Sequence, residues 1–452
     1  MFGPGESSIV VECTSSGTCI TIHAIFTSLL LFVILLTGFA YSTLLERRFL
    51  ASLQARIGPN RAGPLGLLQP VADGIKLIFK EDVTPAAADK IIFWLAPVIK
   101  VVPAIIVVAV IPLGPKVAIP WFDGKWYRLN QGLVDVNVGV LWLLGITSIG
   151  IYGIVLAGWS SNNKYAMLGG LRSSAQMISY ELSMGLAMVV PVMLTGSMSI
   201  GEIIEAQNDP PILGWYVFQN PLAAAIMAIA LLAEVNRAPF DLPEAEQELT
   251  AGYHTEYSGM KFALFYMAEY IGMVAVSMIG AALYFGGYHF VLVDRFPLLG
   301  PVVYGIKVVI LLMVMIWVRG TLPRIRYDRL MSLGWKVMLP FALLAVAWSS
   351  ASVIVAQELD NQAVYIGLSI LASVLFVIGA LIFFDHIGRK PEIAPELGRV
   401  QVVELGGGDG MGAMALRAVD KVAGLPGVVV SAVTGGDDKS AKQDRVETDE
   451  KR

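Results

Sequence analysis

The sequence places an unusual number of carboxylates in one short stretch. Between residues 234 and 256 there are six acids against a single Lys or Arg, which is Arg237. Carboxylates that are crowded and partly buried raise one another's pKa and share protons, which is what a proton relay needs. A solvated acidic loop is the plainer interpretation, but Phe240, Tyr253 and Tyr257 interleave the acids. The acids are Glu234, Asp241, Glu244, Glu246, Glu248 and Glu256.

Ionisable residues also lie inside long apolar segments. Glu181, Glu234 and Glu269 fall within or at the end of three such segments. Lys100 and Lys307 lie in two others. A charge is costly in lipid, so residues of this kind normally face a cavity or a charged partner. Three such glutamates beside an acidic stretch therefore favour a functional role for these acids. A structural ion pair, such as Glu269 with Lys307, is the alternative.

The elements that position these side chains are predicted to be membrane-spanning helices. Of the 452 residues, 56% are hydrophobic and only 15% are charged, against about 25% charged in ordinary soluble domains. This balance excludes a soluble enzyme and a disordered chain. The 32 basic and 36 acidic residues leave no basic excess, which argues against a nucleic-acid binder. The composition predicts an all-α polytopic membrane protein.

A helical span needs about 20 mostly apolar residues. The segments that qualify number about nine. Sixteen Lys and Arg lie in one set of loops, counted with the two residues on either side, against 4 in the remaining loops between spans. The first set comprises loops 46–90, 159–173, 237–259 and 321–335. The positive-inside rule therefore places these four loops in the cytoplasm and the N-terminus outside. The expected spans are 24–45, 91–113, 136–158, 174–197, 221–236, 260–285, 302–320, 336–357 and 364–384.

Three parts of the chain are expected. They are an extracytoplasmic segment 1–23, a transmembrane domain 24–385 and a cytoplasmic tail 386–452. The tail mixes 10 basic with 11 acidic residues, which is typical of a disordered or partner-bound segment. Cys13 and Cys19 lie outside the membrane, where a disulfide can persist. The spacing allows a disulfide and does not require it.

Two cytoplasmic loops carry further candidate residues. The first contains a run, 67–80, whose apolar residues recur at helical spacing, so an amphipathic helix bearing Asp73 is expected at the membrane face. Arg47 precedes this run. The last loop contains Arg324, Arg326 and Asp328, which either anchor the chain to anionic lipid or form an ion pair that docks a cytoplasmic partner. With two Cys and four scattered His, no metal site is expected.

Four stretches, read together, resemble a known family. The chain resembles the H subunit of bacterial NADH:quinone oxidoreductase, the respiratory complex I, whose mitochondrial counterpart is the first mitochondrially encoded subunit. The resemblance covers about residues 20–385. The stretches are Glu46-Arg47-Arg48 with the turn 56–61, residues 159–165 leading to Ile178-Ser179-Tyr180-Glu181, residues 236–246, and Pro323-Arg324-Ile325-Arg326-Tyr327-Asp328.

The resemblance implies that the chain is a subunit of an enzyme and is not catalytic on its own. Proteins of this family form the tunnel through which quinone, either ubiquinone or menaquinone, enters from the bilayer. They also form an acidic funnel that links quinone reduction to proton translocation. By motif match, Arg47, Asp73 and Phe240 would lie near the tunnel. The funnel would comprise Glu181, Glu234, Glu244, Glu246 and Glu248.

The same resemblance implies the partners and the location. Flavin and iron–sulfur clusters would belong to partner subunits, and this chain would bind none. The partners would be the quinone-site subunits of the hydrophilic arm, small membrane subunits and lipid, in the bacterial cytoplasmic membrane. An ion-coupled secondary transporter, a pure membrane scaffold, and a component of a related hydrogenase or antiporter complex are the alternatives. The run 236–248 favours the quinone-linked branch.

Overall fold

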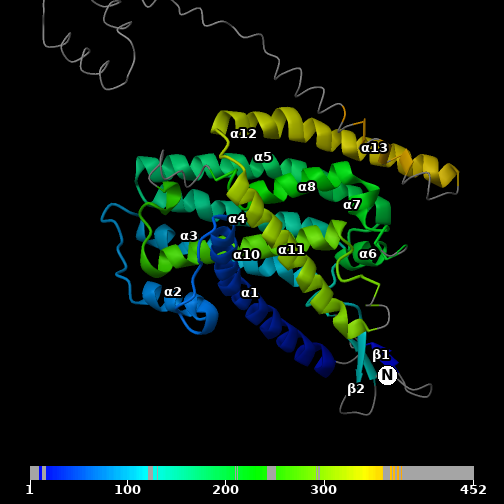
Figure 1. Ribbon diagram of the computed structural model, residues 1–452, viewed down its shortest axis with the longest axis horizontal. Helices are drawn as coiled ribbons and strands as arrows, with labels where there is room; N and C mark the ends of the chain where they lie inside the picture. The colour runs from blue at the N-terminus through cyan, green and yellow to red at the C-terminus, as the bar shows by residue number, and fades with distance from the viewer. Residues whose placement is uncertain are drawn as a thin grey trace, which may run out of the picture. The chain divides into compact units, whose positions relative to one another are not determined.

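The computed structural model describes residues 10–12, 17–120, 126–129, 131–208, 210, 212–241, 251–291, 293, 296–359 and parts of 367–378 (Figure 1). The chain divides into two units, 1–378 and 379–452, and the second lies outside the described residues. The expected tail therefore stays a prediction, as do the acids at 244, 246 and 248.

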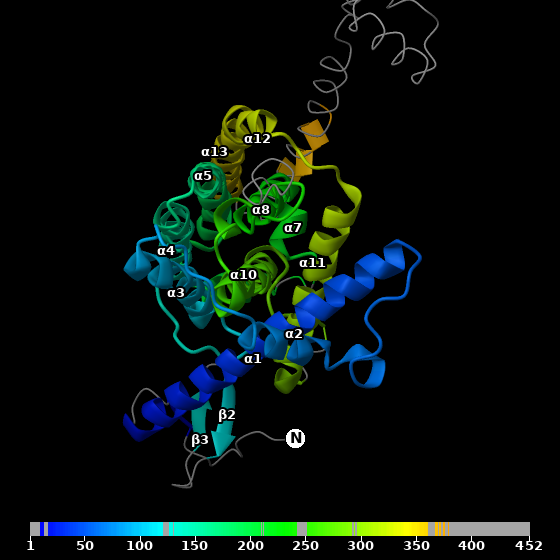
Figure 2. The same cartoon turned by 90° about the vertical axis from the view of Figure 1, so that its left-hand side faces the viewer.

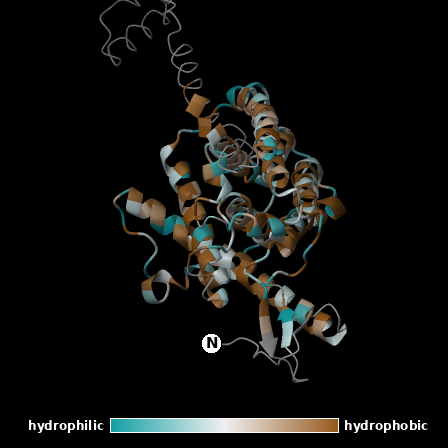
Figure 3. Cartoon of the chain, turned by 90° about the vertical axis from the view of Figure 1, so that its right-hand side faces the viewer, coloured by the Kyte–Doolittle hydropathy of each residue, from teal (hydrophilic) through white to brown (hydrophobic). Residues whose placement is uncertain are grey.

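The described part is helical, and the prediction of an all-α polytopic membrane protein is confirmed. Among the described residues, seven helices are long and apolar enough to cross a membrane (Figure 3). They are α1 (Gly17–Leu53), α3 (Lys90–Ile106) with its 3-10 extension Val107–Val110, α4 (Gly139–Ser160), α5 (Lys164–Thr195), α10 (Gly259–Tyr284), α11 (Gly300–Thr321), and α12 (Tyr327–Leu333) continued through a π-turn (Gly334–Met338) into α13 (Leu339–Glu358).

The expected count of nine spans is not reached within these residues. The fifth expected span forms α8 (Pro221–Glu234), which has only 14 residues. The side chain of Asn220 caps its first turn and Pro221 occupies its first position, so the helix cannot begin earlier. The ninth expected span, 364–384, lies only partly within the described residues.

Short elements join the long helices. The expected amphipathic helix forms as α2 (Gln69–Ile78), and its apolar side chains are exposed, as a membrane-surface helix requires. Only residues 161–163 separate α4 from α5, so most of the expected loop 159–173 is helical, because Asn163 caps α5. The remaining short helices are η2 (Pro64–Gly66), α6 (Ile200–Glu205), α7 (Tyr216–Gln219), η4 (Gly252–His254) and η5 (Pro297–Leu299).

A small sheet lies beside the N-terminal end of α1. Its strands β1 (Val10–Glu12), β2 (Val117–Pro120) and β3 (Trp126–Leu129) are ordered β1-β3-β2. β1 runs parallel to β3, with residue 10 opposite 126, and β2 runs antiparallel to β3. Cys19 is buried against Tyr127 and is disulfide-bonded. The only other cysteine in the sequence, Cys13, lies outside the described residues.

The helices pack in an order that brings distant segments together. α5 packs against α4, α8 and α13, and α3 packs against α4 and α10. α1 packs against α10, α11 and α2, as Figure 2 shows. The buried hydroxyls of Tyr180, Tyr284 and Tyr304 donate to the backbone carbonyls of Leu330, Ala187 and Met278. The first two bonds link helices that are far apart in the sequence, and the third joins the consecutive helices α10 and α11.

Close approach of α4 and α5 depends on glycine. A Cβ atom on Gly158 of α4 would lie 2.7 Å from the carbonyl oxygen of Ala166 in α5. We expect Gly158→Ala to push the helices apart and to destabilise the assembled protein by about 1–3 kcal/mol. The measurement is the midpoint of thermal inactivation in purified membranes. Gly145→Ala, on the same helix with nothing within 4 Å, is the matched control and should leave the midpoint unchanged.

Candidate functional site

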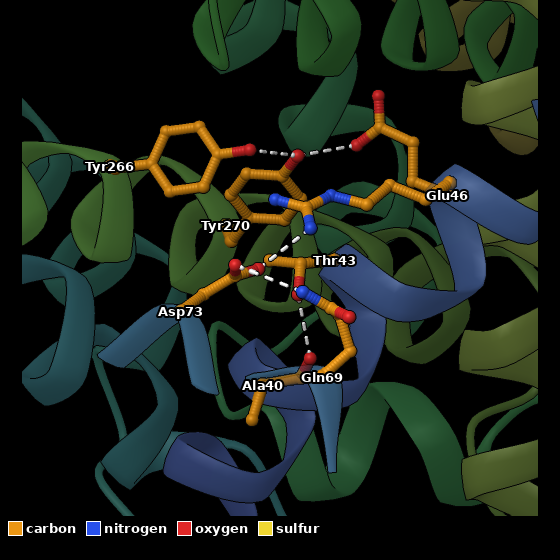
Figure 4. Close-up of polar contacts among 8 residues, drawn as sticks. Ala40, Thr43, Glu46, Gln69, Asp73, Tyr266 and Tyr270 are labelled. Atoms are coloured by element: carbon orange, nitrogen blue, oxygen red, sulfur yellow. Dashed lines mark hydrogen bonds and ion pairs between the residues drawn. The ribbon is translucent and has the colours of Figure 1, made fainter. Parts of the chain in front are cut away.

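Two carboxylates and two guanidinium groups meet where α1, α10 and α11 come together. Glu46 of α1 is 3% exposed and accepts a hydrogen bond from the hydroxyl of Tyr270, with an oxygen–oxygen distance of 2.7 Å (Figure 4). It pairs with Arg319 and lies 3.6 Å from Nη1 of Arg237. Nε of Arg237 lies 2.7 Å from Oε1 of Glu269. We call these five residues the ion cluster.

The ion cluster compensates charges that could not stay buried alone. Arg237 is 6% exposed, and its guanidinium lies 4.3 Å from the ring centre of Tyr270. A cation above an aromatic face is further stabilised when water is excluded. Each carboxylate has at least one guanidinium beside it, so the cluster fixes the segment after α8 against three helices.

The chain immediately after α8 is held by one amide. Nε2 of Gln176, in α5, lies 3.0 Å from the oxygen of Ala233, 3.0 Å from Oδ1 of Asn236 and 2.9 Å from the oxygen of Phe240. Ile325 donates its backbone N–H to the carbonyl of Pro239 and so attaches the last cytoplasmic loop to the same turn. This turn carries Arg237 into the ion cluster.

An apolar groove opens next to the ion cluster. It lies between α1, α2 and the first turns of α10 and has a volume of about 430 Å³. Most of its surface is apolar, and two of its polar lining residues, Arg47 and Asp73, form an ion pair. The walls include Phe39, Thr43, Arg47, Pro70, Asp73, Leu77, Met260, Ala263 and Tyr266.

Two residues expected near a tunnel meet in this groove. Nη1 of Arg47 lies 2.6 Å from Oδ2 of Asp73, and Nε2 of Gln69 donates to the other carboxylate oxygen at 3.1 Å (Figure 4). The pair joins α1 to α2. Phe240 does not line the groove; it is buried and lies 5.6 Å, centre to centre, from the ring of Tyr180.

A second, smaller cavity is lined by Glu234 and Glu269, two of the acids in the apolar helices. Lys100, Thr147, Glu234, Asn236 and Glu269 are among its lining residues, and its volume is about 70 Å³. Lys100 interacts electrostatically with both Glu234 and Glu269. We call this space the acid cavity. Glu269 belongs both to the acid cavity and to the ion cluster, so the two sites are continuous.

The other predicted site residues take separate places. Glu181 of α5 hydrogen-bonds to the hydroxyl of Ser148 in α4. Arg326 and Asp328 form an exposed ion pair with an Nε–Oδ2 distance of 3.2 Å, a kind of contact that contributes little stability. Arg324 is exposed beside them.

The suggested pairing of Glu269 with Lys307 is wrong. Nζ of Lys307 donates instead to the backbone carbonyls of Phe285, Gly287 and His289, at 2.7–2.9 Å. These carbonyls lie at and just beyond the C-terminal end of α10, where the helix dipole favours a cation. Glu269 lies more than three turns earlier in α10, next to Arg237.

Aromatic residues support the start of α10. The ring of Tyr257 stacks on Phe93 with centres 4.1 Å apart, and its hydroxyl donates to the carbonyl of the same residue. Burial raises the pKa of Tyr257 to about 12, so its hydroxyl stays a donor at neutral pH. Phe265 completes the packing from α10. These contacts give no recognisable sequence motif.

Comparison with known proteins decides the family. The family model described as NADH dehydrogenase matches residues 26–350. The chain is 51% identical over 308 residues to the NADH-quinone oxidoreductase H subunit of Protochlamydia amoebophila, which covers 68% of this chain and 90% of that protein. It is 49% identical over 329 residues to an H subunit of the same enzyme from Syntrophobacter fumaroxidans (72% and 94%).

The chain belongs to the family of NADH-quinone oxidoreductase H subunits. The match to the H subunit of Dehalococcoides mccartyi extends over 364 residues at 44% identity, with 79% of this chain and 95% of that protein covered. The family match includes the ion cluster, the groove and the acid cavity. These relatives are matched over nearly their full length, and the residues after 350 lie outside the family model.

The ion cluster makes a prediction about stability. Arg237→Met would remove the ion-pair partner of Glu269 and the cation beside Glu46, and should destabilise the fold by about 3–5 kcal/mol, because a buried ion pair is broken on one side. Arg237→Lys should retain part of this stability. The measurement is the amount of assembled complex on native gels. Arg326→Met, which breaks an exposed pair, is the control and should change assembly little.

Proposed function

We propose that this chain forms the quinone-access tunnel of NADH-quinone oxidoreductase and an acidic funnel that couples quinone reduction to proton translocation. Membership of the H-subunit family makes it a membrane component of a translocase complex that is not catalytic alone. The observation that carries the proposal is the continuity between the apolar groove and the acid cavity through the ion cluster.

The groove suits a molecule with a polar head and an apolar tail. Its walls bring Phe39, Leu77 and Met260 together, whereas Arg47 and Asp73 supply polar groups at one place. A quinone tail gains free energy by leaving water for such walls, and the head needs hydrogen-bonding groups. We infer that the tail of a ubiquinone or menaquinone lies against these helices while its head moves toward partner subunits.

The polar route from groove to acid cavity is short. Tyr266 lines the groove, and its hydroxyl lies 2.8 Å from that of Tyr270. Tyr270 donates to Glu46, and Arg237 lies beside both Glu46 and Glu269. A negative charge that develops on reduced quinone would change the proton affinity of these carboxylates over a few ångströms of low-dielectric protein.

The funnel would continue from the acid cavity. Glu234 of α8 lines this cavity and interacts electrostatically with Glu181 of α5. The glutamates at 244, 246 and 248 would complete the funnel and lie outside the described residues. Protonation changes in this set would bias a two-state loop and pass the coupling outward. Neighbouring membrane subunits would then receive it.

The remaining assignments follow from the same proposal. Flavin and iron–sulfur clusters belong to partner subunits, and quinone is the only redox molecule that this chain contacts. The chain lies in the bacterial cytoplasmic membrane with its N-terminus outside and its C-terminal tail in the cytoplasm. Arg324, Arg326 and Asp328 dock the hydrophilic arm, and anionic lipid surrounds the basic loops.

Blocking the groove tests the tunnel. Ala263→Trp would fill the groove and should lower the rate of NADH-driven reduction of a long-tailed quinone about tenfold or more, because the tail could no longer pass. Ala347→Trp, on the exposed face of α13, is the matched control. Reduction of ferricyanide by the same membranes reports that the hydrophilic arm is assembled. An unchanged quinone rate in the Ala263 variant would refute the tunnel.

Neutralising single acids tests the funnel. Glu234→Gln and Glu181→Gln should each reduce proton pumping at least about threefold in assembled complexes, because the amide cannot take up a proton. The measurement is the proton gradient formed by proteoliposomes during NADH oxidation. Glu358→Gln, at the exposed end of α13, serves as the control. Intact pumping in both the Glu234 and the Glu181 variants would contradict the relay role.

A further inference from the structure

The segment that connects α2 to α3 is fastened to the start of α10. Ser258 accepts a hydrogen bond from the backbone N–H of Val83 at 2.8 Å, and its hydroxyl donates to the carbonyl of Glu81. Gly259 has a φ of +56°, and a Cβ there would lie 3.4 Å from the carbonyl oxygen of Lys80. We call residues 80–84 the strap. The strap begins two residues after Ile78, the last residue of α2.

The strongest attachment of the strap is a buried lysine. Lys261 is 2% exposed, and its Nζ lies 3.0 Å from Oδ1 of Asp82 and donates to Oγ1 of Thr84 at 2.7 Å. The ammonium also lies 4.3 Å and 4.8 Å from the ring centres of Trp94 and Phe93. A buried ammonium that loses its partners is destabilising, so the lysine holds the strap firmly.

Lys261 and the groove occupy opposite faces of the same helix turn. Met260, Phe262 and Ala263 line the groove, whereas Lys261 does not. One turn later, Phe265 is likewise absent from the groove and packs on the ring of Tyr257. Residues four apart share one face of a helix, so Lys261 and Phe265 lie on the face of α10 that points away from the groove.

The two walls of the groove are therefore fixed at two points. Arg47 and Asp73 join α1 to the middle of α2, but their side chains are 43% and 30% exposed, so water weakens this pair. Lys261 joins the chain that follows α2 to α10; its side chain is 2% exposed, whereas that of its partner Asp82 is 39% exposed. Because the ammonium itself is buried, the separation of α2 from α10 depends mainly on Lys261.

We propose that Lys261 is a positioning residue that sets the width of the groove by clamping the strap to α10. The inference rests on the proposed function, because the groove is taken as the path of the quinone tail. Lys261 touches no reacting atom. It determines how well a long apolar tail is held, and a quinone with a short tail is not held there.

The test measures quinone kinetics in native membranes that contain the whole complex. Lys261→Met should raise the KM for a long-tailed quinone about fivefold, with kcat and the KM for a short-tailed quinone changed less than about twofold. Lys261→Arg keeps a cation at the strap and should restore the KM to within about twofold. Lys80→Met, an exposed lysine of the same strap, is the matched control.

A double variant tests whether the strap is the route of the effect. Lys261→Met and Asp82→Asn remove the same contact, so the combined variant should raise the KM no more than Lys261→Met alone. Should Lys261→Met fail to assemble, Thr84→Val and Ser258→Ala each remove one milder attachment and should raise the same KM about twofold. An unchanged KM in both would overturn the proposal.

The outcomes separate this proposal from the one it rests on. If Ala263→Trp blocks the long-tailed quinone but Lys261→Met leaves its KM unchanged, the clamp is refuted and the tunnel stands. If kcat falls equally for both quinones in Lys261→Met, the residue is merely structural and the proposal is overturned. If Ala263→Trp has no effect either, the groove is not the quinone path.

Discussion

The structure depends on the rule that a charge removed from water must meet a partner. Glu46, Arg237, Glu269 and Arg319 satisfy one another where α1, α10, α11 and the segment after α8 converge. Because none of these groups can be buried alone, the cluster fixes four segments together. The same groups connect the groove to the acid cavity, so one set of ion pairs both supports the fold and lies on the proposed coupling route.

Three lysines in or beside the apolar helices satisfy this rule with different kinds of partner. Lys100 faces carboxylates across the acid cavity. Lys261 has a carboxylate, a hydroxyl and aromatic rings. Lys307 has backbone carbonyls, which carry partial negative charge at a helix end. The first lies where charge can change during turnover, whereas the other two hold backbone segments in place.

Sequence predicted the long helices and the amphipathic helix α2, because apolar runs and helical spacing determine these features locally. It did not predict the partner of Lys307, since a hydropathy pattern indicates which residues are buried but not which helix lies opposite. The length of α8 depended on the cap at Asn220. Gln176 and Lys261 act through contacts with residues 57 or more positions away, and no short motif reports such contacts.

The three-stranded sheet has a consequence for biogenesis. β1 is synthesised before α1, but its partner β3 follows α3, so two membrane crossings separate the strands that pair. The number of crossings is even, which puts both strands on one side of the bilayer without any reference to charge. The N-terminal strand must therefore stay unpaired until residue 129 has been synthesised. A ribosome stalled before β3 would leave the N-terminal end of α1 without the sheet that lies beside it.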